Sequence, residues 1–378
     1  MNIGINLLPF RDKLGGAGNY AKNIVRELSL LDTENNYFLF VSRSGLGHFR
    51  TDNPKFELVV SSFNSSLFPV RIFWEQFVFP FQLRKRKIEL LFTPSVAVPL
   101  LHFGRMATTV HDIAYKKLKK KYPALRRLYL AAITRLALRK SEIIFTVSNF
   151  SKEEIIKEYN IAKEKIIVTP NGIDDKFLKP VKDEVFAPLK EKYHLPEKYI
   201  LYVGALEPGK NLESILRVFS YTLKEEGQSD LFLVLTGGMG WKKKKLFNLM
   251  RELSILDNIL ILPYIPDGEL PVIYKLASVL IYISLYEGFG LPVLEGMASG
   301  IPVIASEIPP VKEFAGNSVS FINLHDQNSL KNKLYDLLCD SGKREYFIKK
   351  GMLAAEKYKW NEPARIIYSY FKEKRQKV

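Results

Sequence analysis

Apolar residues along this chain form short continuous runs that alternate with segments in which they recur every three or four positions. Continuous runs of this length favour buried strands, and the recurrence favours helices packed on them. The strands predicted in the first half are residues 2–8, 37–42, 56–60, 88–93, 106–111, 143–147 and 165–169. Those predicted in the second half are residues 199–204, 231–236, 259–262, 279–284 and 301–305.

The two halves repeat one architecture, in which a first strand leads through a glycine loop into a helix. These loops are residues 14–20, which open a helix to about Leu31, and residues 204–211. Regular alternation of strands and helices predicts the α/β class with doubly wound parallel sheets. Ligands bind at the carboxyl ends of such strands, so two facing domains of this kind predict a cleft between them.

The turn at residues 170–175 indicates the boundary between the halves. We expect domains at residues 1–178 and 179–355, with a C-terminal helix at 356–378 that packs back on the first domain. Within the first domain, a helix is expected to start at residues 149–151, with Ser151 as its N-cap and Glu154 completing a capping box.

The stretch from Ser284 to Ser306 is predicted to run from a strand through a glycine loop into a helix. Gly288 and Gly290 allow a ligand to approach the backbone closely, and Pro292 suits the first turn of a helix. The helix N-terminus would favour an anion. Two carboxylates flank it, Glu287 in the loop and Glu295 on the helix, which suits a ligand with both phosphate and hydroxyl groups.

Composition excludes several classes of protein. No run of about 18 apolar residues is present, so a membrane-spanning helix is not expected. The opening MNIGINLLPF is interpreted as a strand and not as a signal peptide. The single cysteine, Cys339, excludes an intramolecular disulfide and a cysteine-based zinc site, and it favours a cytoplasmic protein.

The formal net charge of +16 predicts an acidic partner. Residues 116–140 hold ten basic residues and no acidic one. After a lysine-rich lead, apolar residues recur there at helical spacing, which predicts a basic amphipathic helix. This helix could dock on an anionic membrane surface or pack on its own domain. Its apolar positions are Leu125, Leu128, Tyr129, Ala132, Ile133, Leu136 and Ala137.

Several motifs together resemble the retaining nucleotide-sugar glycosyltransferases of the GT-B fold, sequence family 4. The string YEGFGLPVLE places Glu287 and Glu295 at the family's spacing. The resemblance extends over nearly the whole chain. The other matching motifs are Gly15 to Gly18, Thr109 to Asp112, Thr146 to Ser148, Pro170 to Asp174 and Gly204 to Asn211.

The resemblance implies a hexosyltransferase that uses a nucleotide-diphosphate sugar and no cofactor. It implies that residues 1–178 form the acceptor side and 179–355 the donor side. The implied catalytic residues are His111, Lys210 and Glu287. Glu287 would accept hydrogen bonds from the sugar hydroxyls, and Glu295 would accept them from the ribose. The implied donor-binding residues are Gly15, Gly16, Gly18, Gly209, Lys210, Tyr264, Ile265, Glu287, Gly288, Phe289, Gly290, Leu291 and Glu295.

The resemblance also implies retention of the anomeric configuration, with the acceptor attacking on the face that the diphosphate leaves. No Asp-x-Asp motif is present, so no metal site is expected. Lys210 and the helix that begins near Leu291 would then balance the charge of the diphosphate. Gly209 stands where many relatives have an arginine, which removes one cation from this set.

The acceptor is expected to be a glycan or a lipid-linked saccharide, as in the synthesis of O-antigen or another polysaccharide. The Trp74-Glu75-Gln76 segment resembles mannosyltransferases of the family, which favours GDP-mannose as donor, followed by a UDP-hexose. We expect a cytoplasmic enzyme, peripheral at the inner face of the membrane, and no nucleic-acid partner.

Two other classes of function stay open. Residues 16–21 fit the G-x-G-x-x-A pattern of an NAD(P)-dependent oxidoreductase or epimerase. No acidic residue ends the strand at 38–43 to bind a ribose, and Asn160 interrupts the helix that Tyr159 and Lys163 would have to share. The other class is a non-catalytic protein that binds membranes or nucleic acid through residues 116–140.

Overall fold

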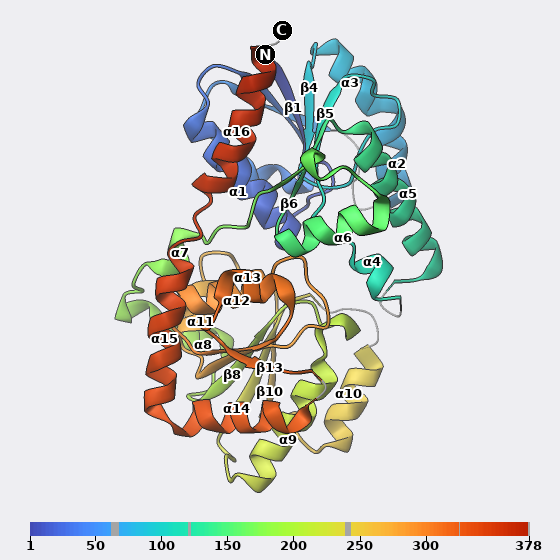
Figure 1. Cartoon of the computed structure of the whole chain (residues 1–378). Coiled ribbons are helices and arrows are strands. Elements are labelled where there is room, and N and C mark those ends of the chain that lie inside the picture. Colours follow the sequence, from blue (N-terminus) through green and yellow to red (C-terminus); the bar gives the residue numbers. More distant parts are fainter. Residues whose placement is uncertain (62–67, 120–121, 239–242, 325, 377–378) are drawn as a thin grey trace. The chain divides into compact units, whose positions relative to one another are not determined.

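A computed structural model describes residues 1–376 apart from 62–67, 120–121, 239–242 and 325 (Figure 1). The chain divides into two compact units. Unit 1 holds residues 1–172 and 359–378, and unit 2 holds residues 173–358. The division lies a few residues before the expected boundary at 178, because the chain leaves the first sheet at Val168 and turns at once.

Unit 1 contains one parallel sheet in the order β3-β2-β1-β4-β5-β6-β7. The expected runs form these strands, with ends that differ by a few residues. The strands are β1 (Asn2–Asn6), β2 (Asn36–Ser42), β3 (Phe56–Ser61), β4 (Leu90–Thr93), β5 (Arg105–Thr109), β6 (Ile143–Thr146) and β7 (Ile166–Val168).

The helices of unit 1 include a continuous run in which a π-helical turn, η2 (Trp74–Val78), separates α2 (Phe68–Phe73) from α3 (Phe79–Lys85). The C-terminal helix α16 (Asn361–Arg375) packs on α1 (Gly16–Leu31). The others are α4 (Ala114–Lys117), α5 (Ala124–Lys140) and α6 (Asn149–Tyr159).

One sequence expectation for unit 1 is wrong in detail. The N-cap of α6 is Ser148, whose Oγ accepts a hydrogen bond from the backbone N–H of Ser151. The helix expected after the lysine-rich lead of residues 116–140 is α5, which Pro123 precedes, and α4 ends earlier, at Lys117. Only the C-terminal half of the predicted apolar stripe is buried, and Leu125 and Leu128 are exposed.

Unit 2 contains a second parallel sheet in the order β10-β9-β8-β11-β12-β13. The strand β13 (Ser320–Ile322) was not predicted. The expected strands are β8 (Tyr199–Val203), β9 (Phe232–Thr236), β10 (Ile259–Leu262), β11 (Val279–Tyr282) and β12 (Val303–Ser306).

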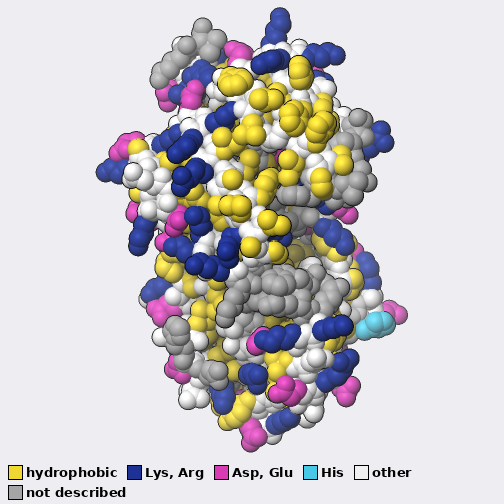
Figure 2. All heavy atoms as spheres, turned by 90° about the vertical axis from the view of Figure 1, so that its right-hand side faces the viewer, with side chains coloured by type: hydrophobic (Ala, Val, Ile, Leu, Met, Phe, Trp, Pro, Cys, Tyr) yellow, Lys and Arg dark blue, Asp and Glu magenta, His cyan; other side chains and the backbone are white. Residues whose placement is uncertain are grey.

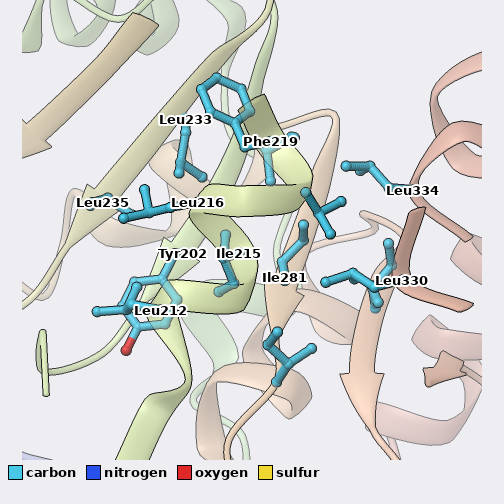
Figure 3. Close-up of a cluster of buried hydrophobic side chains, with 14 of the residues drawn as sticks. Tyr202, Leu212, Ile215, Leu216, Phe219, Leu233, Leu235, Ile281, Leu330 and Leu334 are labelled. Atoms are coloured by element: carbon cyan, nitrogen blue, oxygen red, sulfur yellow. The ribbon is translucent and has the colours of Figure 1, made fainter. Parts of the chain in front are cut away.

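Helices cover the sheet of unit 2, and its core lies between α9 and the strands (Figure 3). Leu216 and Phe219 of α9 point toward the sheet, and Leu330 of α14 joins them. Strands with two covered faces need continuous apolar runs, as the sequence has. The helices are α7 (Asp175–Leu178), α8 (Phe186–Tyr193), α9 (Leu212–Glu225), α10 (Lys243–Glu252), α11 (Leu270–Lys275), α12 (Leu291–Ala298), α13 (Pro309–Ala315), α14 (Gln327–Cys339) and α15 (Ser341–Ala355).

Among the described residues, no helix is both long and apolar enough to span a membrane. Both sheets are parallel, and both units carry helices on their sheets, as the alternating pattern predicted. The expected α/β class with two Rossmann-like domains is therefore confirmed.

Candidate active site

The glycine loop after β11 leads into α12 through a residue with positive φ. Gly290 is the N-cap, with φ of 117° and ψ of 49°, a backbone conformation that favours glycine. Pro292 stands in the first turn, as expected. The Phe289 ring is buried and stacks on Phe314 with 4.6 Å between ring centroids. Phe289 therefore anchors the loop with its side chain, which leaves its backbone to contact a ligand.

Lys210 and Glu287 form an ion pair at the ends of two adjacent strands. Lys210 ends the short 3₁₀ turn η5 (Pro208–Lys210) after β8, and Glu287 follows β11. The Lys210 Nζ donates hydrogen bonds to Glu287 Oε1 at 2.5 Å and to the Tyr282 hydroxyl at 3.0 Å. The backbone N–H of Leu285 bonds the carbonyl of Gly209 at 2.9 Å, so the two loops are also joined through the backbone.

The ion pair is mostly buried, with side-chain exposures of 14% for Lys210 and 15% for Glu287. Burial alone would lower the pKa of Lys210, but Tyr282 and Glu287 raise it well above its ordinary value. The pKa of Tyr282 is also raised, by burial and by Glu287. Lys210 is therefore a fixed cation in a site of low polarity, where its charge acts more strongly than in water.

Glu295 lies on α12 but is buried. Its Oε2 accepts a hydrogen bond of 2.7 Å from the hydroxyl of Tyr274 on α11. Burial raises the pKa of Glu295 to about 7, although Tyr274 and Lys176 oppose the shift. Sequence reasoning missed Tyr274 and Lys176, because neither lies in the motif around Glu295. Asp174 and Asp267, which lie within 4 Å of Lys176, raise the pKa of Glu295 further.

His111 follows β5 in unit 1 and is held in one tautomer. Its Nε2 lies 3.0 Å from the carbonyl oxygen of Pro94, which can only accept, so Nε2 carries the proton. The ring of Tyr20 meets the imidazole edge-on at 5.0 Å. Burial lowers the pKa of His111, while Pro94 and Asp112 partly offset that effect. A neutral ring in this tautomer presents Nδ1 as an acceptor.

Of the three glycines in the first glycine loop, two are exposed and one is buried. Gly15 is the N-cap of α1 in extended conformation, and Gly16 begins the helix. Gly18 is buried against Leu14, and a Cβ there would lie 2.8 Å from the Leu14 side chain. Gly15 and Gly16 thus leave the positive end of α1 open to an anion, whereas Gly18 serves local packing.

The remaining expected donor residues all belong to unit 2. Tyr264 and Ile265 follow β10, with Tyr264 exposed and Ile265 buried. Gly288 and Gly209 are buried in their loops, and Leu291 is half-buried at the start of α12. In the part of the chain that the structure describes, no three His, Cys, Asp or Glu side chains are grouped to hold a metal ion.

Comparisons with known proteins bear on both units. Residues 14–177 match the family model Glycosyltransferase Family 4, and residues 187–353 match the model Glycosyl transferases group 1. The chain is 28% identical to the O-antigen chain mannosyltransferase B of Escherichia coli over 362 residues, which cover 93% of this chain and 94% of that protein. The matches give no support to the oxidoreductase and non-catalytic alternatives.

Two solved structures share the fold over almost the whole chain. Sucrose-phosphate synthase from Thermosynechococcus elongatus has a TM-score of 0.80 and 18% identity, with all of both chains covered. Anabaena Alr3699/HepE, solved in complex with UDP and glucose, has a TM-score of 0.76 and 15% identity, with 98% of this chain and 99% of that chain covered. The chain belongs to the glycosyltransferases of the GT-B fold, with a family 4 N-terminal half and a group 1 C-terminal half.

Proposed function

We propose that this glycosyltransferase moves mannose from GDP-mannose to a glycan or lipid-linked saccharide, with retention of the anomeric configuration and without a metal ion. The observation that carries this proposal is the buried Lys210–Glu287 pair in the unit that holds the α12 N-terminus. A cation and a helix N-terminus suit a diphosphate, and a carboxylate suits sugar hydroxyls.

The choice of mannose rests on similarity. The Escherichia coli relative is named for the mannosylation of O-antigen chains, and the match covers nearly all of both proteins. The Anabaena HepE complex contains UDP and glucose, which supports a nucleotide-diphosphate sugar as the donor class. A UDP-hexose is therefore the second candidate donor.

The proposed reaction breaks the bond between the anomeric carbon and the β-phosphate oxygen and forms a bond from that carbon to the acceptor oxygen. Lys210 and the N–H groups at the start of α12 stabilise the charge that grows on the departing diphosphate. The acceptor attacks on the same face, and a diphosphate oxygen takes its proton. With Lys210 as the counter-charge, the mechanism needs no metal ion.

The other residues have supporting roles in this proposal. Glu287 accepts hydrogen bonds from the sugar hydroxyls, and Glu295 accepts one from the ribose. His111 offers a neutral acceptor nitrogen to the sugar. Backbone N–H groups of Gly15 and Gly16 add donors for the diphosphate, which would offset the arginine that Gly209 replaces.

The acceptor is proposed to be a growing O-antigen or another polysaccharide precursor at the cytoplasmic face of the membrane. The name of the Escherichia coli relative supports this class of acceptor. The lipid portion of such an acceptor would require the enzyme to work at a membrane surface.

The decisive experiment measures release of nucleoside diphosphate from a panel of nucleotide sugars, with EDTA present and absent. We expect turnover of GDP-mannose above that of the UDP-hexoses, with no loss in EDTA, and an α-linked product by NMR. Thermal shifts should show that GDP stabilises the protein and NADP does not. If the folded protein neither hydrolyses nor transfers any of the nucleotide sugars, the proposal is overturned.

A further inference from the structure

The exposed large apolar side chains of unit 1 are concentrated on three segments. These segments are the helical run α2–η2–α3, the loop 98–104 and α5. Figure 2 looks onto the right-hand side of Figure 1, where α2, α3 and α5 lie, and it shows hydrophobic side chains gathered there. The members, each between 40% and 83% exposed and together called the apolar face, are Val70, Phe73, Phe77, Phe81, Leu100, Leu101, Phe103, Leu125 and Leu128.

Contacts between the three segments hold the apolar face together. Gln76 donates a hydrogen bond to the carbonyl of Val98 at 3.1 Å and accepts one from the N–H of Leu100 at 2.7 Å. The Lys140 Nζ at the end of α5 bonds the carbonyl of His102 at 3.1 Å and lies 5.2 Å from the centroid of the Phe103 ring. The face is therefore a property of the fold and not of one loose loop.

The helical run separates inward from outward aromatic side chains. Phe79 and Leu83 are buried in the unit 1 core with Ile133 and Ala137 of α5. Phe73, Phe77 and Phe81 recur every four residues on the outer side, and the rings of Phe73 and Phe77 lie 5.0 Å apart. A row of exposed phenylalanines lowers the solubility of a protein unless a partner covers it. Contiguous exposed apolar patches of this kind therefore mark interaction sites.

Positive charge accompanies the apolar face. Segments 68–85, 98–104 and 124–140 contain eight Arg and Lys residues and one acidic residue, Glu75. Glu75 is buried and lies 3.5 Å from Arg71, whose side chain is 14% exposed, so this pair adds neither charge to the surface and seven basic residues remain. Arg84 and Lys85 end α3, three and four residues after Phe81, and Arg126 lies between Leu125 and Leu128 in the sequence of α5.

We propose that the apolar face is the membrane-docking surface of this protein and that it binds the interface of a bilayer rich in anionic lipids. Aromatic and aliphatic side chains would enter the boundary between headgroups and acyl chains, while the flanking Arg and Lys side chains contact lipid phosphates. A second copy of the chain is a poor occupant, since pairing this face with itself would bring the basic residues together. Nucleic acid is also a poor occupant, because protein surfaces that bind DNA are polar and positively charged and do not expose rows of phenylalanine.

This surface goes beyond the basic segment 116–140 that the sequence suggested. Lys116 and Lys117 of that segment are paired with Glu158 and Glu154 of α6, so their charges are partly neutralised. The proposed surface instead takes its apolar part mainly from residues 70–81 and 100–103. It is also independent of the chemistry of sugar transfer, because none of its members lies in the candidate active site.

The test is co-sedimentation of the full-length protein with vesicles of phosphatidylcholine and with vesicles of equimolar phosphatidylcholine and phosphatidylglycerol. We expect binding to the anionic vesicles that weakens with added salt. The triple variant Phe73→Ser, Phe77→Ser, Phe81→Ser should lose at least about tenfold in affinity, since its anchoring area is removed. The triple variant Arg84→Gln, Lys85→Gln, Arg126→Gln should lose about fivefold in vesicle affinity for each charge removed. It should also lose the preference for anionic lipid.

Matched controls separate this surface from general hydrophobicity and charge. Leu30→Ser removes an equally exposed apolar side chain of α1, and Lys349→Gln with Lys350→Gln and Lys357→Gln removes three exposed cations of unit 2. Both controls should bind as the wild type does. Vesicle binding that is absent, or that the phenylalanine variant leaves unchanged while it stays folded by circular dichroism, would overturn the proposal.

Sedimentation velocity provides the competing outcome. If the wild type forms a dimer and the phenylalanine variant is a monomer, a second copy of the chain covers the apolar face. That result would also overturn the proposal. Release of nucleoside diphosphate from a soluble nucleotide sugar should not change in any of these variants. Failure of membrane docking is thereby distinguished from failure of the proposed transfer reaction.

Discussion

Lys210 and Glu287 face each other across the ends of adjacent parallel strands, with 2.5 Å between Nζ and Oε1 in a mostly buried site. Each charge is compensated by the other, and the hydroxyl of Tyr282 accepts a second hydrogen bond from the amine. The pair thus keeps a cation and an anion side by side before any substrate arrives. A ligand that binds both groups would replace this mutual contact with its own.

The first prediction concerns the energetic coupling of this pair. Removal of one partner leaves the other charge buried, so Lys210→Met or Glu287→Gln should each destabilise the protein by about 3 kcal/mol. The double variant should cost less than the sum of the two. The measurement is urea unfolding followed by tryptophan fluorescence and circular dichroism.

The exposed pair Lys245–Glu213 is a matched control, because its Nζ–Oε1 distance is also 2.5 Å and it lies in the same unit. Lys245→Met and Glu213→Gln should have little effect, since exposed pairs contribute little to stability. If both pairs lower the free energy of unfolding by the same amount when they are disrupted, burial is not the cause of the effect. In transfer assays Lys210→Met and Glu287→Gln should each lose about 10²-fold or more in kcat/KM, and the control variants should lose nothing.

The second prediction follows from Glu295. Burial raises the pKa of its carboxyl to about 7 from an ordinary value of 4.5, so the folded protein holds a proton that the unfolded chain releases. Stability from this group is therefore present below pH 4.5 and is lost as the pH rises toward 7. Glu295→Gln should remove up to about 3 kcal/mol of this pH dependence.

The measurement for Glu295 is the urea midpoint as a function of pH for wild type and variant. Glu75 has a pKa raised to about 7 by burial as well, so the wild-type slope contains both groups and only the difference between proteins reports on Glu295. The control is Glu252→Gln on the exposed surface of α10. A slope that Glu295→Gln does not change would disprove the assignment.

The third prediction concerns the protonation of His111. Burial lowers its pKa, so the folded ring stays neutral while the unfolded ring gains a proton near pH 6.5. Its contribution to stability should fall as the pH drops below 6.5, and His111→Gln should remove that part of the slope. Nitrogen NMR of the ring should show a protonated Nε2 and a bare Nδ1 at pH 6.5. A doubly protonated ring there would contradict the lowered pKa, and a bare Nε2 would contradict the contact with Pro94.

Much of the fold could be predicted because buried parallel strands require continuous apolar runs. The runs at 199–204 and 279–284 became β8 and β11, and the helix expected to begin near Pro292 became α12. The strand β13 was missed because it has only three residues, of which the first, Ser320, is polar. Its pairing with β12 is a tertiary effect that no local pattern records.

The candidate site was predictable only in part. The residues around Glu287 came from a motif, but the partners Tyr282 and Tyr274 come from elements outside it, where sequence gives no distance. Leu125 and Leu128 show a second question that spacing alone leaves open. Helical spacing placed them on an apolar stripe that could dock on a membrane or pack on its own domain. Spacing cannot tell whether a neighbour covers the stripe, and the structure leaves both residues exposed.

The last prediction concerns the glycine that starts α12. Gly290 has a φ of 117°, and a Cβ there would lie 3.0 Å from Val311. Gly290→Ala should cost about 1 to 3 kcal/mol through backbone strain and should displace the first N–H groups of α12. Since those groups are proposed to hold the diphosphate, GDP should stabilise this variant less in thermal shifts than it stabilises the wild type. Gly268→Ala is the control, because a Cβ at Gly268 meets no atom within 4 Å and its backbone is not in the positive-φ region. If Gly290→Ala keeps both the wild-type stability and the full GDP shift, the helix N-terminus is not the diphosphate site.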